Sequence, residues 1–324
     1  MCGIVGYLGH REAYPVIIKG LQRLEYRGYD SAGVALLNGD LNVYKKKGKV
    51  ADLHDFAKGK NLNSNIGIGH TRWATHGEPN DKNAHPHLSN SGKLAMIHNG
   101  IIENYSSLKT DLIEKGFDFK SDTDSEVFIN FIEDIYLNSE VSLAEAVRLA
   151  LNKVVGAYAI AIISLEDPNL MIAARKGSPL VVGLGKDEFF LASDATPIIE
   201  YTNEVVYLDD QEIAIIKDGQ LTIKNVSDVE MTPYVQTIDI QLEAIEKGGY
   251  DHFMLKEIFE QPKSIGDCLR GRLQAKEGKL VLGGIFDYVT KMVNADRILI
   301  IACGTSWHAG LVAEYIFEEF CRIL

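Results

Sequence analysis

Strand-like runs lie at both ends of the first part of this chain, and most of its helical patterns lie between them. From Tyr158 to Val226 the sequence consists almost entirely of short β-type runs separated by turn residues. Two turns, Asn38-Gly39 and Asp218-Gly219, are dipeptides typical of tight hairpins. Strands at both ends with helices grouped between them favour antiparallel sheets covered by helices, an α+β fold.

Apolar residues at helical intervals predict a helix over residues 13–26. Two more helices are indicated by the pattern of a capping box, in which Ser or Thr precedes Glu by three residues. The first pairs Thr123 with Glu126, and the second pairs Ser142 with Glu145. In a full capping box each side chain bonds the backbone N–H of the other residue.

The character of the sequence changes after about residue 240, and residues 241–262 are polar and rich in helix formers. An apolar run at 297–302 then leads into a turn at 303–306 and a helical pattern at 307–320. A buried strand, a tight turn and a helix are typical of the opening of a doubly wound α/β domain. We therefore predict one domain over 2–240, and a linker with an incomplete second domain over 241–324.

The overall charge and the cysteines exclude several classes of function. The chain has 324 residues and a formal net charge of −12, so it would repel phosphate, and nonspecific nucleic-acid binding is not expected. No apolar run approaches the ~20 residues that cross a bilayer, and the N-terminus does not resemble a secretory signal, so no membrane partner is expected. The four cysteines are scattered, which predicts no disulfide framework and favours a cytoplasmic setting.

Cys2 is the first candidate for catalysis, because removal of Met1 places a thiol and an α-amine on one residue. A free α-amine has a pKa near ~8, so part of it is neutral at cellular pH and can accept the thiol proton. A histidine base is then not required. The alternative is that Cys2 is only a small apolar residue at the start of a strand, and Met-Cys-Gly alone does not exclude it.

Other motifs suit the remaining needs of acyl transfer to a thiol. Asn99 and Gly100 offer two neutral donors for an oxyanion, although Asn-Gly after a strand is usually only a turn. Arg72 suits two-pronged pairing with a carboxylate and Trp73 could cover a pocket, the alternative being a surface Arg beside a buried Trp. Asp124 could bind an ammonium group, although acids favour a first helical turn in any case.

Two further polar patterns were weighed as ligand sites. Five histidines gather in one stretch without an acidic or Cys partner at metal-ligand spacing, so we expect no metal and interpret them as satisfied polar groups in loops: His70, His76, His85, His87 and His98. At the turn 303–306, backbone N–H groups and the hydroxyls of Thr305 and Ser306 suit an anion such as phosphate. The Lys of a nucleotide-binding loop is missing there, and a capped helix without a ligand remains the alternative.

In this order, the motifs resemble the isomerizing glutamine–fructose-6-phosphate aminotransferases, which are class II glutamine amidotransferases. The matching stretches are MCGIVGY at 1–7, LEYRGYDSAG at 24–33, GHTRWATHGEP at 69–79, HNGIIENY at 98–105, SDTDSEV at 121–127, SPLVVG at 178–183, LASDA at 191–195, EKGGYDHFMLKEIFEQP at 246–262 and ACGTS at 302–306. The first five mark the wider class. The stretch at 246–262 together with ACGTS is far more specific to these aminotransferases.

The resemblance implies an N-terminal-nucleophile fold, a four-layer αββα sandwich over 2–240, followed over 241–324 by a linker and the beginning of an α/β sugar-isomerase domain. It implies hydrolysis of L-glutamine to glutamate and ammonia through a Cys thioester. The full-length enzyme would use the ammonia to convert fructose 6-phosphate to glucosamine 6-phosphate. It implies no cofactor, and a homodimer for the full-length enzyme.

The resemblance also implies a role for individual residues. Cys2 would be the nucleophile, with Asn99 and Gly100 as the oxyanion hole. The glutamine site would comprise Arg72, Trp73, Thr75, His76, Asp124 and Arg27, in which Trp73 gates the ammonia passage and Arg27 orders the nucleophile region. Thr305 and Ser306 would contact the sugar phosphate.

The family's isomerase part extends beyond the last residue of this chain. We therefore expect the fructose 6-phosphate site to be incomplete here and only glutaminase activity to remain. Another class II amidotransferase is one alternative, but it would need a nucleotide or pyrophosphate site downstream. A non-catalytic sugar-phosphate sensor is a second alternative, and it predicts loss of Cys2, Asn99-Gly100 or Arg72, all of which are present.

Overall fold

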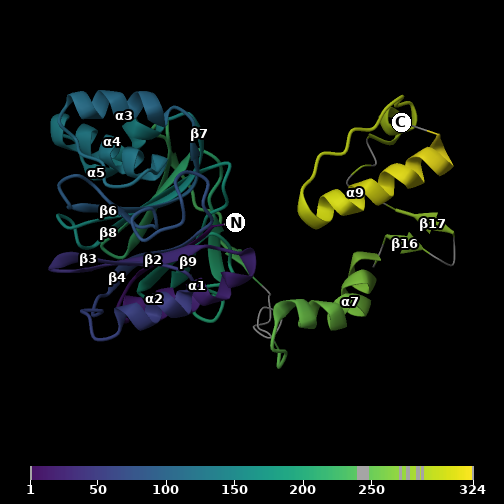
Figure 1. Ribbon diagram of the computed structural model, residues 1–324, viewed down its shortest axis with the longest axis horizontal. Coiled ribbons are helices and arrows are strands. Elements are labelled where there is room, and N and C mark those ends of the chain that lie inside the picture. Colours follow the sequence, from purple (N-terminus) through teal and green to yellow (C-terminus); the bar gives the residue numbers. More distant parts are fainter. Residues whose placement is uncertain are drawn as a thin grey trace. The chain divides into compact units, whose positions relative to one another are not determined.

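The computed structural model describes residues 2–238, 248–269, 272–274, 278–281, 285 and 288–322. The chain divides into two compact units, Met1–Gly249 and Tyr250–Leu324. The first unit contains two large antiparallel sheets with helices on them, and the second contains mainly helices (Figure 1).

The sheets of the first unit are both antiparallel throughout. The eight-stranded sheet has the order β15 (Gln236–Thr237), β11 (Glu204–Tyr207), β9 (Val181–Gly185), β10 (Glu188–Ala192), β1 (Gly3–Leu8), β4 (Ile66–Arg72), β2 (Ser31–Asn38) and β3 (Asp40–Lys47). The seven-stranded sheet has the order β14 (Glu230–Met231), β13 (Gln220–Asn225), β12 (Glu212–Lys217), β8 (Leu170–Lys176), β7 (Gly156–Ser164), β6 (Leu94–Ile102) and β5 (His87–Leu88).

Helices cover the outer face of each sheet. The eight-stranded sheet carries α1 (Ala13–Arg23) and α2 (Val50–Ala57), and the seven-stranded sheet carries α3 (Tyr105–Glu114), α4 (Asp124–Asn138) and α5 (Leu143–Leu151) (Figure 1). The short 3-10 turn η1 (Glu25–Arg27) follows α1. This arrangement confirms the predicted αββα sandwich.

Three apolar layers hold the sandwich together, and strand periodicity separates them. In β1, Ile4 points between the sheets while Val5 packs under the helices of its own sheet. In β6, Ile97 likewise points between the sheets while Met96 packs under α4. Because side chains alternate along a strand, neighbouring residues in each sheet reach different layers.

Both hairpins lie where the turn dipeptides predict them. Asn38 and Gly39 lie between the paired strands β2 and β3, and Asp218 and Gly219 lie between β12 and β13. Gly39 has a φ of +70°, and Gly219 a φ of +76°, a backbone conformation that glycine adopts without strain.

The capping boxes form only by half. The hydroxyl of Thr123 accepts from the N–H of Glu126 at 3.3 Å, and that of Ser142 accepts from the N–H of Glu145 at 3.3 Å, so both helices begin as predicted. The reciprocal bonds differ, because each glutamate has another partner. The Glu126 carboxylate accepts from the N–H groups preceding Thr123, while that of Glu145 pairs with Arg148.

The second unit departs from its predicted strand. It contains α7 (Phe253–Leu269), the strand pair β16 (Leu273–Gln274) and β17 (Lys279–Leu280), α8 (Val289–Val293), α9 (Gly304–Ile316) and a π-helical turn, η4 (Phe317–Cys321). The helix expected at 307–320 is confirmed, but residues 297–303 form no strand. A parallel strand requires partners that bond its backbone and cover its side chains, and Leu299 and Ile301 remain 79% and 86% exposed.

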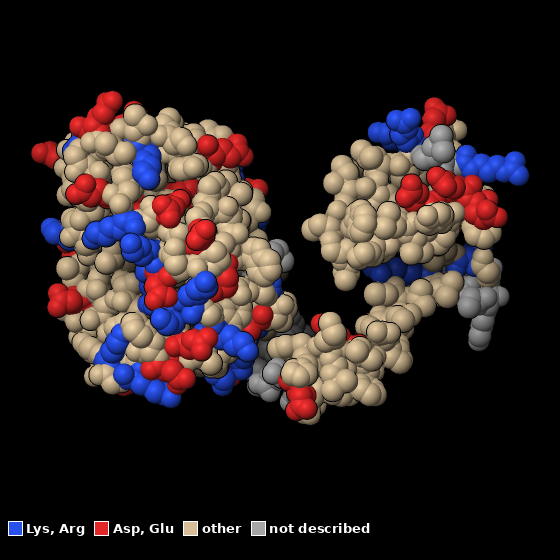
Figure 2. Space-filling view, in the orientation of Figure 1, with Lys and Arg blue, Asp and Glu red and all other residues tan. Residues whose placement is uncertain are grey.

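The faces of the two units that Figure 2 shows differ in how many charged side chains they present. On the face of the first unit seen in Figure 2, acidic and basic side chains are interspersed, whereas much of the visible second unit is uncharged. The second unit accordingly exposes many large apolar side chains. Among the described residues, no helix is both long and apolar enough to span a bilayer.

Four buried histidines surround the ends of the central strands: His70 on β4, His85 before β5, His87 on β5 and His98 on β6. The rings of His70 and His85 stack at 4.3 Å between centroids, and His85 meets His87 edge-on at 4.7 Å. Nδ1 of His85 accepts from the backbone N–H of His98 at 3.2 Å. The interpretation of these residues as loop histidines was therefore wrong for His70, His87 and His98, which lie on strands.

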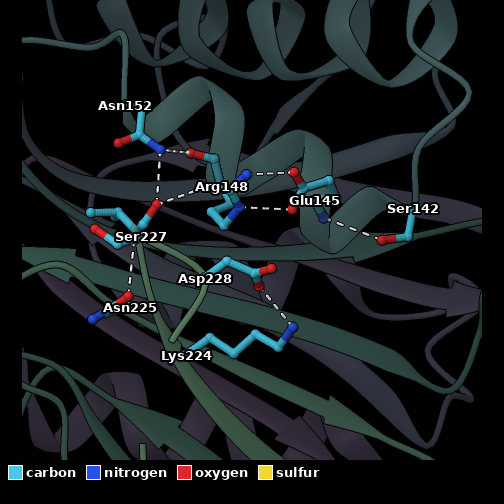
Figure 3. A network of polar contacts seen from close by, with 9 residues as sticks. Ser142, Glu145, Arg148, Asn152, Lys224, Asn225, Ser227 and Asp228 are labelled. Carbon is cyan, nitrogen blue, oxygen red and sulfur yellow. Dashed lines mark hydrogen bonds and ion pairs between the residues drawn. The ribbon is translucent and has the colours of Figure 1, made fainter. Parts of the chain in front are cut away.

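Polar contacts fasten α5 to the end of β13 (Figure 3). The Arg148 guanidinium donates to both carboxylate oxygens of Glu145, at 2.7 and 2.6 Å, and to the Val226 carbonyl at 2.8 Å. The side-chain amide of Asn152 donates to the same carbonyl at 3.0 Å. Two side chains of one helix thus share one acceptor beyond β13, which ties the helical layer to its sheet.

Replacing Arg148 by Met keeps much of the apolar stem but removes the bonds to Glu145 and Val226. Because this guanidinium is mostly buried, we expect the free energy of unfolding in urea to fall by about 1–2 kcal/mol. The control is Lys224→Met, which breaks a more exposed ion pair with Asp228 in the same region and should lower the free energy of unfolding by much less, because solvent screens exposed ion pairs. An equal loss in both variants would contradict this assignment.

The buried histidines also make stability depend on pH. Burial lowers the pKa of all four, that of His70 to about 3, so the folded protein keeps them neutral. The unfolded chain takes up protons near its usual histidine pKa of about 6.5, so acid favours unfolding. We expect the free energy of unfolding to fall below about pH 6.5, by up to about 1.4 kcal/mol per pH unit for each histidine.

Urea unfolding at successive pH values between about 7 and about 5 measures this slope. The variant His87→Gln should have a shallower slope, since it lacks one group that protonates on unfolding. The variant His10→Gln makes the same substitution at an exposed position and serves as the control. A free energy independent of pH over this interval would show that the histidines protonate without unfolding.

Candidate active site

A cavity of about 430 Å³ lies where the ends of β1, β4 and β6 meet. It is lined by all nine residues that the sequence predicts for the first unit: Cys2, Arg27, Arg72, Trp73, Thr75, His76, Asn99, Gly100 and Asp124. Thr305 and Ser306 lie elsewhere, in the first turn of α9 in the second unit, where both are exposed.

Cys2 directly precedes β1, whose first residue Gly3 pairs with Thr71 of β4. This pairing brings the thiol to the Trp73 main chain, whose N–H donates to Sγ at 3.1 Å and whose carbonyl accepts from the thiol at 3.5 Å. Burial raises the pKa of the Cys2 thiol, and the Trp73 N–H only partly opposes this effect. The thiol is therefore protonated at neutral pH and needs a base before it can attack.

Asn99 and Gly100 lie within β6, so the alternative of a simple turn was wrong. The Asn99 side-chain NH2 donates to the Cys2 carbonyl at 3.2 Å, which places an amide donor beside the thiol-bearing residue. Gly100 has a φ of +135°, and a Cβ there would lie 2.0 Å from the Ala157 carbonyl oxygen. The position therefore requires glycine, and the backbone beside Asn99 stays uncovered by a side chain.

Arg72 ends β4 and is only 4% exposed, while Trp73 is 55% exposed. The alternative interpretation, a surface Arg beside a buried Trp, was therefore wrong. Nη2 of Arg72 donates to the carbonyls of His76 and Gly77. Nη1 is buried without a hydrogen-bond partner among the described residues. Burial lowers the pKa of Arg72, but guanidinium stays cationic in proteins. A buried cation with a free donor suits a carboxylate ligand.

Trp73 stands over Gly28, where a Cβ would come within 2.9 Å of the indole ring. Gly28 also has a φ of +77°, so two constraints favour glycine at this position. The carboxylate of Asp30 accepts from the N–H of Ala74 at 2.5 Å and thereby fixes the loop that carries the indole. Thr75 follows on the same loop and is exposed.

Asp124 is the first residue of α4 and is buried. One of its oxygens accepts from the N–H of Ile102 at 2.8 Å. His76 lies nearby in the cavity, with its ring edge-on to Tyr105 at 5.2 Å. A carboxylate and the Arg72 guanidinium thus line one cavity, an arrangement that matches the two opposite charges of a free amino acid.

Arg27 is connected to the start of β1 through one intermediate residue, Ser193. Its Nη1 donates to the Ser193 hydroxyl at 3.3 Å, and that hydroxyl oxygen accepts from the N–H of Ile4 at 3.2 Å. Arg27 is also ion-paired with Asp194. These bonds connect η1 to β1 only two residues after Cys2.

Several lining residues were not singled out from the sequence as site residues: Ile101, Thr123, Ser125, Ser178, Pro179, His70, His85 and His98. Ser178 and Pro179 belong to the stretch at 178–183, but no local pattern distinguishes their roles. His70 reaches Asn99 across 29 positions and between two sheets, so sequence spacing alone could not pair them. Among the described residues, no group of three or more His, Cys, Asp or Glu side chains could hold a metal ion.

Comparisons with known proteins identify the family of this chain. The family model described as a glutamine amidotransferase domain matches residues 55–240. The glutamine–fructose-6-phosphate aminotransferase (isomerizing) of Bacteroides thetaiotaomicron is 61% identical over 100% of this chain and 53% of its own length. That of Chlorobaculum tepidum is 55% identical with the same coverage. The chain therefore spans about half the length of the curated relatives it matches.

Solved structures of glutamine amidotransferases share the first unit's fold. The glutamine phosphoribosylpyrophosphate amidotransferase from B. subtilis, complexed with ADP and GMP, superposes with a TM-score of 0.60 and 27% identity over 71% of this chain and 50% of that one. A structure described as the allosteric regulatory enzyme of purine biosynthesis gives 0.61 and 28% over 69% of this chain and 49% of that one. From its matched domain, its relatives and its fold, this chain belongs to the class II glutamine amidotransferase family.

Proposed function

We propose that this chain hydrolyses L-glutamine to glutamate and ammonia, with Cys2 as the nucleophile. The observation that carries the proposal is the cavity, which combines a thiol, an amide donor on Asn99 and a buried Arg72 Nη1 that has no hydrogen-bond partner in the described part of the chain. Acyl transfer requires these three functions together, as nucleophile, oxyanion donor and substrate clamp.

Glutamine binds through its two charged groups. The Arg72 guanidinium pairs with the α-carboxylate, for which it offers a buried donor. The Asp124 carboxylate faces the α-ammonium, with Thr75 and His76 lining the same cavity. Trp73 covers the opening and gates the passage of ammonia.

The reaction begins when the α-amine of Cys2, freed by removal of Met1, accepts the thiol proton. Sγ attacks the side-chain amide carbon, and the tetrahedral oxyanion accepts hydrogen bonds from Asn99 Nδ2 and the Gly100 N–H. The C–N bond breaks, and the α-ammonium returns its proton to the leaving ammonia. Water then hydrolyses the thioester to glutamate and restores the thiol, while Arg27 keeps the start of β1 in place through Ser193.

In the whole protein, we propose that ammonia converts fructose 6-phosphate to glucosamine 6-phosphate, since the relatives are isomerizing glutamine–fructose-6-phosphate aminotransferases. Residues 241–324 would then be a linker and the beginning of the first sugar-isomerase domain, with Thr305 and Ser306 at the sugar phosphate. Their place at the start of α9 supports this, because helix N-termini bind phosphate. A homodimer of the whole protein and a cytoplasmic location belong to the same proposal.

Replacing Cys2 by Ala should abolish glutamine hydrolysis, because a methyl group cannot attack the amide. The measurement is glutamate release from glutamine by the purified chain. The control Cys268→Ala changes an exposed cysteine of the second unit and should keep full activity. Intact mass of the active protein should show that Met1 is absent, and full activity with Met1 retained would contradict the α-amine as base.

Replacing Arg72 by Ala should raise KM for glutamine, with a loss in kcat/KM of about 2–4 kcal/mol, because the substrate carboxylate loses its buried partner. The variant Arg72→Lys keeps the charge but not the fork and should fall between Ala and the unmodified chain. Steady-state kinetics across a wide range of glutamine concentrations measures both. An unchanged KM in Arg72→Ala would remove this residue as the clamp.

A further inference from the structure

We propose that His70 is a positioning residue that holds the Asn99 amide in the orientation needed for catalysis. This inference rests on the proposed role of Asn99 as an oxyanion donor. Nε2 of His70 and Oδ1 of Asn99 lie 2.7 Å apart, and both side chains are buried. The bond crosses the sandwich, because His70 belongs to β4 of one sheet and Asn99 to β6 of the other.

The orientation matters because only one end of the Asn99 amide can donate. Nδ2 donates to the Cys2 carbonyl at 3.2 Å, so Oδ1 points toward His70. An amide turned by half a rotation would place Oδ1 against the Cys2 carbonyl, an arrangement of two acceptors. It would also withdraw the N–H donor from the oxyanion, so the unrotated amide must be stabilised.

A neutral His70 with its proton on Nε2 supplies this stabilisation. Oδ1 can only accept, so Nε2 must be the donor, and one proton is enough for this arrangement. Burial lowers the pKa of His70 to about 3, which keeps the ring in the neutral form near neutral pH. The 2.7 Å contact between Nε2 and Oδ1 therefore favours the tautomer with its proton on Nε2.

The His70 ring is itself held in place by its neighbours. It stacks on the ring of His85, which in turn accepts from the N–H of His98. Gly33 pairs with His70 across β2 and β4, and a Cβ at Gly33 would lie only 2.1 Å from the His85 carbonyl oxygen. The absence of that Cβ allows the His85 backbone to approach β2, so packing fixes the direction of the Nε2–H bond.

The first test compares three substitutions at one position by steady-state glutaminase kinetics. Gln can place an amide N–H near the site of Nε2, Asn places its own near Nδ1, and Met has neither donor. We expect His70→Met and His70→Asn to lower kcat by about 10–100-fold. This loss is smaller than the roughly 10²–10³-fold typical of removing an oxyanion donor altogether, because Asn99 is still present. KM should change little, and His70→Gln should keep most of the activity. Equal kcat values for Gln and Asn would overturn the proposal.

The second test is a double-mutant cycle with Asn99→Ala. If His70 acts through Asn99, His70→Met should lower kcat in the unmodified chain but not further in the Asn99→Ala background. An equal fold-loss in both backgrounds would overturn the proposal and assign His70 an independent structural role. Should Asn99→Ala alone retain full kcat, the oxyanion role itself fails, a result distinct from failure of the His70 inference. Urea unfolding of each variant identifies any loss that is due to folding.

Discussion

Close packing of the two sheets is the constraint on which the rest of the first unit depends. The layer between them contains many small side chains, including Ala35 on β2, Ala95 on β6 and Ala173 on β8. Small residues bring the two backbones near enough for a polar side chain of one sheet to reach the other. The bonds of Asn99 to Cys2 and to His70 both cross this interval. The sheets therefore build the site as well as the core.

Much of this architecture could be predicted because its determinants are local. The hairpin at Asn38-Gly39 depends on a turn that glycine permits, and the starts of α4 and α5 depend on a hydroxyl three residues before a glutamate. The prediction of full capping boxes was wrong for the reciprocal bonds, because the carboxylates of Glu126 and Glu145 bond to other groups that the sequence pattern does not contain. The prediction of a strand at 297–302 was wrong. Strand formation depends on distant pairing partners, which an apolar run does not supply by itself.

In the candidate site, too, residues whose role shows locally in the sequence could be predicted, and residues whose role depends on a distant partner could not. Cys2, Arg72 and Asn99 could be selected from the sequence, since each carries chemistry that acyl transfer needs, and the structure brings all three into one cavity. The buried histidines could not be interpreted in this way. His70 owes its importance to a partner on another sheet, and sequence proximity to His76 suggested a loop cluster instead. Residues that act through a second residue are found only once both are placed in three dimensions.

The main chain and the side chain of Trp73 make separate contacts. Its main chain bonds the sulfur, and the following peptide is anchored by Asp30, whereas its indole rests on the bare backbone of Gly28 and is otherwise largely open to solvent. Substituting the side chain therefore leaves the sulfur's backbone contacts intact. The side chain at position 73 can therefore change in size and polarity while the Cys2 sulfur stays in the same place.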